Sequence, residues 1–172
     1  MILKPSGKSL YSVIGTYFFI IITITLLLQA SFNYLQTKKQ LQDNIINDVE
    51  TSSLLLKGSL IKFIDSYQVT EYENLIKNEM KHQNLLAIIV EDYLTGKVIG
   101  QQSYMTGFIR DKDLKLRPLV LEKSNHIEQV KNSFFKKETL LKKDNEILGK
   151  LIIYANDYHL KKELENIIIN NL

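Results

Sequence analysis

The first third of the chain contains a long stretch without charge. From Ser9 to Thr37 there is no Asp, Glu, Lys or Arg, and Val13 to Leu28 reads VIGTYFFIIITITLLL. A helix that crosses a bilayer needs about 20 mostly apolar residues, and residues 10–29 supply them. Charged side chains are costly at the bilayer centre, and this window has none. We therefore predict a transmembrane helix over residues 10–29, surrounded by lipid.

The same stretch has a competing interpretation as a cleaved signal peptide. Lys4 and Lys8 give it a basic start, and LQA before Ser31 is a weak cleavage signal. However, the apolar core is longer than the roughly 7–15 residues of such a segment. We therefore favour an uncleaved anchor over a signal peptide.

Basic residues near the span indicate its orientation. Lys4 and Lys8 precede it closely, whereas Lys38 and Lys39 lie further from its other end. The positive-inside rule then places residues 1–9 in the cytoplasm. The expected location is the cytoplasmic (inner) membrane, with the soluble part on the periplasmic, extracytoplasmic side.

Charge and cysteine content exclude several classes of protein. The chain has no cysteine, which excludes a disulfide framework and the usual zinc clusters. Its net charge is +3, but residues 1–37 hold two lysines and no acid, so the remainder has 22 − 2 = 20 basic and 19 acidic residues. This balance does not indicate a nucleic-acid surface. We expect no nucleic-acid partner and no cofactor.

A second long helix is expected after the span, over residues 30–67. Its apolar positions recur at steps of three or four when Ser53 fills one gap: Ile45, Val49, Leu56, Leu60 and Phe63. The half nearer the span is polar with a thin apolar seam, which suits a stalk paired with a second copy. We therefore predict a homodimer through this helix. The alternative is an amphipathic helix packed on its own domain, which we favour after Leu54.

Residues 68–156 show a change from helical to strand periodicity. A helix is expected over Thr70–His82, with Thr70 and Glu73 as a capping box. The expected strands are Leu85–Tyr93, Val98–Tyr104 after a turn at Thr95-Gly96, a possible short strand in PLVLE within an irregular segment 105–126, Asn132–Lys143 and Ile147–Ala155. Asp157 then caps a last helix, Tyr158–Leu172. This order predicts an α+β domain with an antiparallel sheet of four or five strands.

No arrangement of residues predicts catalysis. Glu91 and Asp92 are adjacent in a strand, so their side chains face opposite ways and cannot act as one acid–base pair. The three histidines lie far apart without metal-ligand spacing: His82, His126 and His159. The chain has neither a phosphate-binding loop nor a Gly-x-Ser-x-Gly motif. We therefore predict no catalytic residue, no metal site and no enzyme activity within this sequence.

The order of segments resembles a known class of receptor domain. A basic start, one span and a long helix lead into AIIVEDYLTGKVIG, then FFKKETLLKKDNEILGKLIIYAND, then a helix. This is similar to the extracytoplasmic Cache/PAS-like sensor region of bacterial membrane receptors, which include histidine kinases of two-component systems, diguanylate cyclases and chemoreceptors. The resemblance implies a sensor domain over residues 68–156 and an exit helix over residues 157–172 that returns to the membrane. It also implies a kinase or cyclase output module, which this chain does not contain.

The resemblance also implies a small-molecule site between the sheet and the loop that crosses it. In this sequence it corresponds to Tyr93, Tyr104 and Arg110. Arg110 would fork onto a ligand carboxylate, and Tyr104 would offer a flat wall with a hydroxyl. The alternative is that the two tyrosines pack as cross-strand neighbours, while Arg110 pairs with Asp111 or Asp113.

Two functions therefore remain open. The first is a signal-input module that passes a ligand-induced helix rearrangement across the membrane. The second is a membrane-anchored structural or assembly protein that holds a partner through its long helix, without a small-molecule ligand. An anchored hydrolase has no motif to support it.

Overall fold

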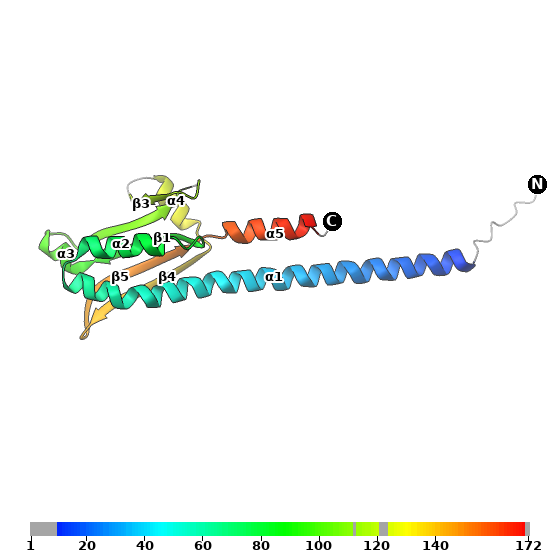
Figure 1. The fold of residues 1–172 in the computed structure, drawn as a ribbon, viewed down its shortest axis with the longest axis horizontal. Helices are drawn as coiled ribbons and strands as arrows, with labels where there is room; N and C mark the ends of the chain where they lie inside the picture. Colours follow the sequence, from blue (N-terminus) through cyan, green and yellow to red (C-terminus); the bar gives the residue numbers. More distant parts are fainter. Residues whose placement is uncertain (1–9, 112, 121–123, 171–172) are drawn as a thin grey trace, which may run out of the picture.

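The computed structural model describes residues 10–111, 113–120 and 124–170 (Figure 1). Lys4 and Lys8, and the end of the possible strand in PLVLE, lie outside these residues. The fold is α+β, as predicted. In chain order its elements are α1 (Leu10–Asp65), α2 (Val69–Glu79), β1 (Leu85–Asp92), α3 (Tyr93–Val98), β2 (Tyr104–Arg110), β3 (Leu116–Pro118), α4 (Ser124–Lys131), β4 (Phe135–Lys143), β5 (Glu146–Ala155) and α5 (Tyr158–Asn170).

The two helices expected before residue 68 are one continuous helix, α1, of 56 residues. Its length is about 84 Å at 1.5 Å per residue. The apolar window near its start has no buried residue, and α1 is long and apolar enough to cross a membrane. Three threonine hydroxyls in this part donate to the carbonyl four residues earlier: Thr16, Thr23 and Thr25. These bonds satisfy the hydroxyls within the helix, as an apolar environment requires.

The second half of α1 lies against the sheet. The predicted stripe of Ile45, Val49, Leu56 and Leu60 is buried, and Ser53 fills the gap as expected. Phe63 was expected to end the stripe, but Ile64 is the buried residue there and Phe63 is only partly covered. The step from Leu60 to Ile64 is four residues, which keeps the stripe on the same helix face.

The five strands form one antiparallel sheet in the order β3-β2-β1-β5-β4. The first and last strand pairs therefore meet through β1 and β5 at the centre. Helices α1 and α2 lie along one face, with most of the core beneath them (Figure 1). On the other face, Leu119, which follows β3, and Val130 of α4 pack on a smaller cluster. This cluster consists of Ala87, Ile89, Ile109, Ile152 and Tyr154.

The predicted first hairpin was wrong in its second strand. Thr95-Gly96 is not a tight turn but part of the short helix α3, and the strand that pairs with β1 is Tyr104–Arg110 rather than Val98–Tyr104. Asp92 explains the difference, because its carboxylate accepts hydrogen bonds from the Thr95 amide (2.9 Å) and hydroxyl (2.6 Å). An Asp that accepts a bond from an amide three residues on is an N-cap. The segment expected to be irregular, 105–126, consequently contains β2 and β3.

The predicted capping box of the second helix was also wrong. Helix α2 begins at Val69, so Thr70 lies inside its first turn, and the N-cap residue Gln68 makes no side-chain cap bond. Glu73, which was expected to complete the box, instead accepts hydrogen bonds from residues of β2. The helix also ends at Glu79, before His82.

The sheet has two distinct ends. Leu85 and Ala155 are paired where β1 starts and β5 ends, and Arg110 ends β2 on the same side. We call this the junction end, because α5 starts there and runs back beside α1 toward its apolar half (Figure 1). At the tip end, Asp92 pairs with Tyr104, next to α3.

Candidate functional site

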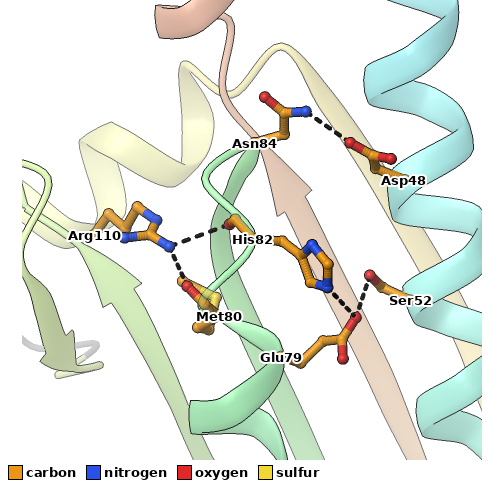
Figure 2. Close-up of polar contacts among 7 residues, drawn as sticks. All are labelled: Asp48, Ser52, Glu79, Met80, His82, Asn84 and Arg110. Carbon is orange, nitrogen blue, oxygen red and sulfur yellow. Dashed lines mark hydrogen bonds and ion pairs between the residues drawn. The ribbon is translucent and has the colours of Figure 1, made fainter.

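At the junction end of the sheet, polar contacts join one loop to α1, to β2 and to the segment that precedes α5. The loop is Met80–Asn84, which connects α2 to β1. Figure 2 shows it between Arg110 of β2 on one side and α1 on the other. We take this loop and its contacts as the candidate functional site, because α1 and α5 both leave the domain here.

Arg110 holds the loop from the side of the sheet. Its guanidinium donates to the carbonyls of Leu85 (3.0 Å), Leu114 (3.2 Å) and His82 (3.1 Å), and also to that of Met80. Burial lowers the pKa of Arg110 from its ordinary value, but an arginine stays protonated throughout the physiological range. With its donors directed at backbone carbonyls, Arg110 fixes the path of the chain between α2 and β1.

Glu79 ties the end of α2 to α1. Its Oε1 accepts a hydrogen bond of 2.5 Å from the hydroxyl of Ser52, which is buried on α1. The same oxygen lies 3.8 Å from Nε2 of His82 (Figure 2). A hydroxyl bond to a carboxylate at this distance is among the stronger hydrogen bonds in proteins. This contact therefore links α1 directly to the beginning of the loop.

A second contact with α1 is made at the end of the loop. The side-chain amide nitrogen of Asn84, Nδ2, donates to Oδ2 of Asp48 at 2.7 Å (Figure 2). The backbone carbonyl of Asn84 accepts from the backbone amide of Asn156, one of the two residues between β5 and α5. Asn84 is thus in contact with the helix that enters the domain and with the segment that leads out of it.

Two cavities flank the start of α5 at the junction end. The first has a volume of about 370 Å³ and lies between α1, Asn84 and α5. The second, of about 270 Å³, lies on the other side of α5 and is lined by Gln83, Arg110, Leu114, Tyr158 and Lys162. Both volumes are close to the lower limit of small-molecule sites.

The tip end holds a different set of polar residues, which are buried. Asp92 is fully buried and accepts from the hydroxyl of Tyr72 (3.2 Å) in addition to its two bonds from Thr95. Burial and the neighbouring Asp92 raise the pKa of Tyr72 far above its ordinary value. Tyr72 is therefore a permanent donor to Asp92, and this pair acts as a structural contact between α2 and the sheet.

Beside this pair, Glu73 connects α2 to β2. Its Oε1 accepts from the hydroxyls of Tyr104 (3.3 Å) and Thr106 (2.8 Å). Burial, followed by the charge of Glu73, raises the pKa of Tyr104. Tyr104 thus faces α2 and uses its hydroxyl within the protein.

The three residues predicted to bind a ligand do not form one site. Tyr104 and Arg110 lie at opposite ends of β2, about 20 Å apart at 3.3 Å per residue. Tyr93 begins α3, and its hydroxyl donates to Glu91 (3.3 Å), which also pairs with Lys150 (3.3 Å). Of the three, only Arg110 lines a cavity at the junction end. Ligand contact by any of them stays a prediction.

The alternative contacts expected for these residues are not formed either, because each residue has other partners. Tyr104 is opposite Asp92 in the sheet, not opposite Tyr93. Asp111 pairs with Arg117 (3.2 Å) and accepts from two backbone amides, whereas Arg110 binds carbonyls. Glu91 and Asp92 contact different residues, as expected for neighbours in a strand.

Sequence analysis did not identify the contacts of Ser52, Glu79 and Asn84. Ser52 and Glu79 are 27 residues apart, and Asp48 and Asn84 are 36 residues apart. No local spacing connects such pairs. The nearest signal was the Ser52-Ser53 pair in an otherwise apolar stripe, because a polar residue in a buried stripe requires a partner.

Metal binding has no basis in the part of the chain that is described. Within those residues, no group of three or more His, Asp or Glu side chains is placed to hold an ion.

The chain matches no family model, and a search of curated proteins finds no related sequence.

Proposed function

We propose that this chain is the extracytoplasmic signal-input region of a bacterial membrane receptor, with a PAS/Cache-like sensor domain. One observation carries the proposal. Helix α1 is uninterrupted from the apolar segment at its start to the buried core at Ile64. A change in the packing of the domain on α1 therefore moves the segment that would cross the membrane, since a helix transmits displacement along its axis.

The second helix at the junction end supports the same role. Helix α5 follows β5 and runs beside α1 (Figure 1), and its Leu160 and Leu164 belong to the core cluster that includes Ile45 and Val49 of α1. Entry and exit of the domain thus lie side by side, next to the loop held by Arg110. A ligand that favours one arrangement of α1 and α5 shifts the equilibrium by its difference in affinity for the two states.

The proposal includes a homodimer through α1. Leu54 and Leu55 lie on the side of α1 away from the sheet and are 74% and 66% exposed. Gly58, one turn further, leaves open space for a neighbouring helix. Because the chain has no cysteine, Leu54→Cys provides a unique thiol. We expect it to form a disulfide-linked dimer in membranes, whereas Lys77→Cys on α2 should not.

The signalling role is tested in a chimera. Residues 1–172 are joined to the second span and kinase module of a receptor with a measurable output. The chimera is then exposed to a panel of amino acids, carboxylates and amines. We expect at least one compound to change the output, and a Ser52→Ala/Asn84→Ala variant, which weakens the contacts of α1 with the end of α2 and with the loop, to reduce that change.

The matched control is Lys97→Ala/Glu146→Ala, which removes an exposed ion pair of 3.8 Å at the tip end. This variant should respond as the wild type does. An output that no compound changes, with the chimera folded and in the membrane, would contradict a sensor role. In that case a structural role, with a partner bound to the exposed side of α1, becomes the better explanation.

A further inference from the structure

The larger cavity at the junction end is a crevice between α1 and α5. Five of its lining residues come from α1, two from α5, and one from the α2–β1 loop: Leu41, Asn44, Ile45, Asn47, Asp48, Leu160, Glu163 and Asn84. Its volume of about 370 Å³ accommodates a small organic molecule. The crevice differs from the position implied by the receptor resemblance, which lies between the sheet and its crossing loop.

The lining combines an apolar floor with a polar rim. Ile45 and Leu160 are buried, and Leu41 is partly buried. The rim consists of Asp48, Glu163 and the three asparagines. None of the eight lining residues is basic. The rim therefore carries two carboxylates that no neighbouring lysine or arginine of the crevice neutralises.

The hydrogen bonds near the rim keep this charge available. Oδ2 of Asp48 accepts from the side-chain amide of Asn84, which is a neutral partner (Figure 2). Two lysines of α5 have other surroundings: Lys161 pairs with Asp157 at 2.9 Å, and Lys162 lines the other cavity. Within the residues that the structure describes, neither Asp48 nor Glu163 forms an ion pair.

The composition of the rim favours an organic cation over a metal ion. Calcium takes six to eight oxygen ligands, and magnesium demands near-octahedral geometry. The described residues offer no group of three acids or histidines at this place. In contrast, an ammonium group needs only a few acceptors, and its methylene chain gains by contact with Leu41, Ile45 and Leu160.

We propose that the crevice between α1 and α5 binds a short aliphatic amine, with its ammonium groups on Asp48 and Glu163 and its methylene chain on the apolar floor. Such a ligand contacts the helix that enters the domain and the helix that leaves it. The inference names a ligand class for the input module proposed above and rests on that proposal for its meaning in signalling. Binding itself can be measured without any output.

The test is calorimetric titration of the full chain in lipid nanodiscs with putrescine (1,4-diaminobutane). We expect saturable binding that weakens at high salt, because the interaction is between partly exposed charges. Asp48→Asn and Glu163→Gln each remove one charge and keep the side-chain shape. Each should weaken binding about three- to tenfold.

The controls distinguish specific binding in the crevice from general attraction to the acidic residues of the surface. Asp43→Asn on α1 and Glu165→Gln on α5 alter exposed acids that do not line the crevice, and they should leave the affinity unchanged. 1,4-Butanediol has the same chain without charge and should not bind, and calcium should not displace putrescine. If either test variant is unfolded by circular dichroism, Asn47→Lys replaces it, because an added ammonium group at the rim should also weaken binding.

Absence of putrescine binding at millimolar concentration would overturn the inference. So would equal affinity for the diol, full displacement by calcium, or equal losses in the test and control variants. These results are independent of the chimera. If the chimera responds only to other compounds, the sensor role stands but this crevice is not its ligand site. If putrescine binds and the chimera does not respond, the crevice is a binding site that gives no signal.

Discussion

The two ends of the sheet hold their polar residues in different ways. At the tip end, the carboxylate of Asp92 is fully buried and receives three hydrogen bonds, from Tyr72 and Thr95. At the junction end, the pair of Asp48 and Asn84 is exposed, and two cavities flank the start of α5. The tip end is therefore fixed by buried contacts, whereas the junction end combines the bond of the buried Ser52 with exposed contacts that water can replace.

The backbone of the tip end is closely packed at two glycines. A Cβ added at Gly96 would meet the backbone of Ser103, and one added at Gly149 would meet that of Glu91, both at the tip end. Close approach of this kind leaves no room for alternative arrangements. The molecule thus combines a rigid end far from the apolar half of α1 with a more adaptable end facing it (Figure 1). The predictions that follow test this contrast.

The largest effect is expected for Asp92→Ala. The substitution removes the N-cap of α3 and leaves the buried Tyr72 hydroxyl without its acceptor. We expect a loss of about 3 kcal/mol in the free energy of unfolding, measured by urea denaturation in detergent micelles. Asp92→Asn, which retains an acceptor for Thr95, should lose less. A loss below about 1 kcal/mol for Asp92→Ala would show that the tip end is not the rigid end.

Arg110→Ala should have the next largest effect, of about 2 kcal/mol. The variant loses hydrogen bonds to four backbone carbonyls, but three of these bonds are only partly buried and the fourth is exposed, so water can take the place of the guanidinium. Hydrogen exchange should increase mainly in the loop of residues 80–84. Arg117→Ala is the control, because its ion pair with Asp111 is exposed. An equal loss in both variants would contradict the role of Arg110 in holding the loop.

Arg110 also shows what the sequence leaves undetermined. Its predicted partner was a ligand carboxylate or, as the alternative, Asp111 or Asp113, but in the structure it donates to carbonyls 25 to 30 residues earlier in the chain and to that of Leu114. A backbone carbonyl is the same in every residue, so no sequence pattern marks it as a partner. The junction end was therefore out of reach of sequence reasoning, apart from the polar residues of α1.

Periodic elements were predicted more successfully. The apolar stripe of α1 repeats over several turns, so a single departure at Phe63 does not obscure it. Strand β5 was recognised from a dense apolar run, and it lies at the sheet centre beside β1. The failure at Val98 had a local cause: Asp92 caps α3 through the Thr95 amide, a contact that the prediction of a strand, a turn and a second strand did not include. Short helices depend on one capping residue, whereas long elements depend on many.

A smaller effect is expected for Tyr72→Phe, about 1 kcal/mol at neutral pH, because only the hydrogen bond to Asp92 is lost. The variant should also change the response to alkali. Burial and Asp92 raise the pKa of Tyr72, so the native state keeps its proton where the unfolded state, with an ordinary pKa of about 10, has lost it. The contribution of Tyr72 to the free energy of unfolding is then fully present below about pH 10 and falls as the pH rises further.

In Tyr72→Phe, this part of the alkaline loss should disappear, and the difference from wild type should shrink as the pH rises above about 10. Urea denaturation at several pH values measures it. The pKa values of Tyr93 and Tyr104 are also raised, so some alkaline loss should remain in the variant. An unchanged alkaline slope would mean that the Tyr72 hydroxyl is not isolated from water and that the tip end is more open than its burial indicates.

The smallest effect on global stability is expected for Asn84→Ala, less than about 0.5 kcal/mol. The hydrogen bond that it removes is exposed, so water replaces Asn84 at the Asp48 carboxylate and little free energy is lost. Local motion should nevertheless change, because the loop loses a side-chain contact with α1. We expect faster hydrogen exchange in residues 80–84 and at the start of α5, with the amides of β1 unaffected. A global loss comparable to that of Asp92→Ala would remove the distinction between the two ends, since the junction end would then be as tightly fixed as the tip. An unchanged exchange rate would show instead that Arg110 and Ser52 hold the loop without Asn84.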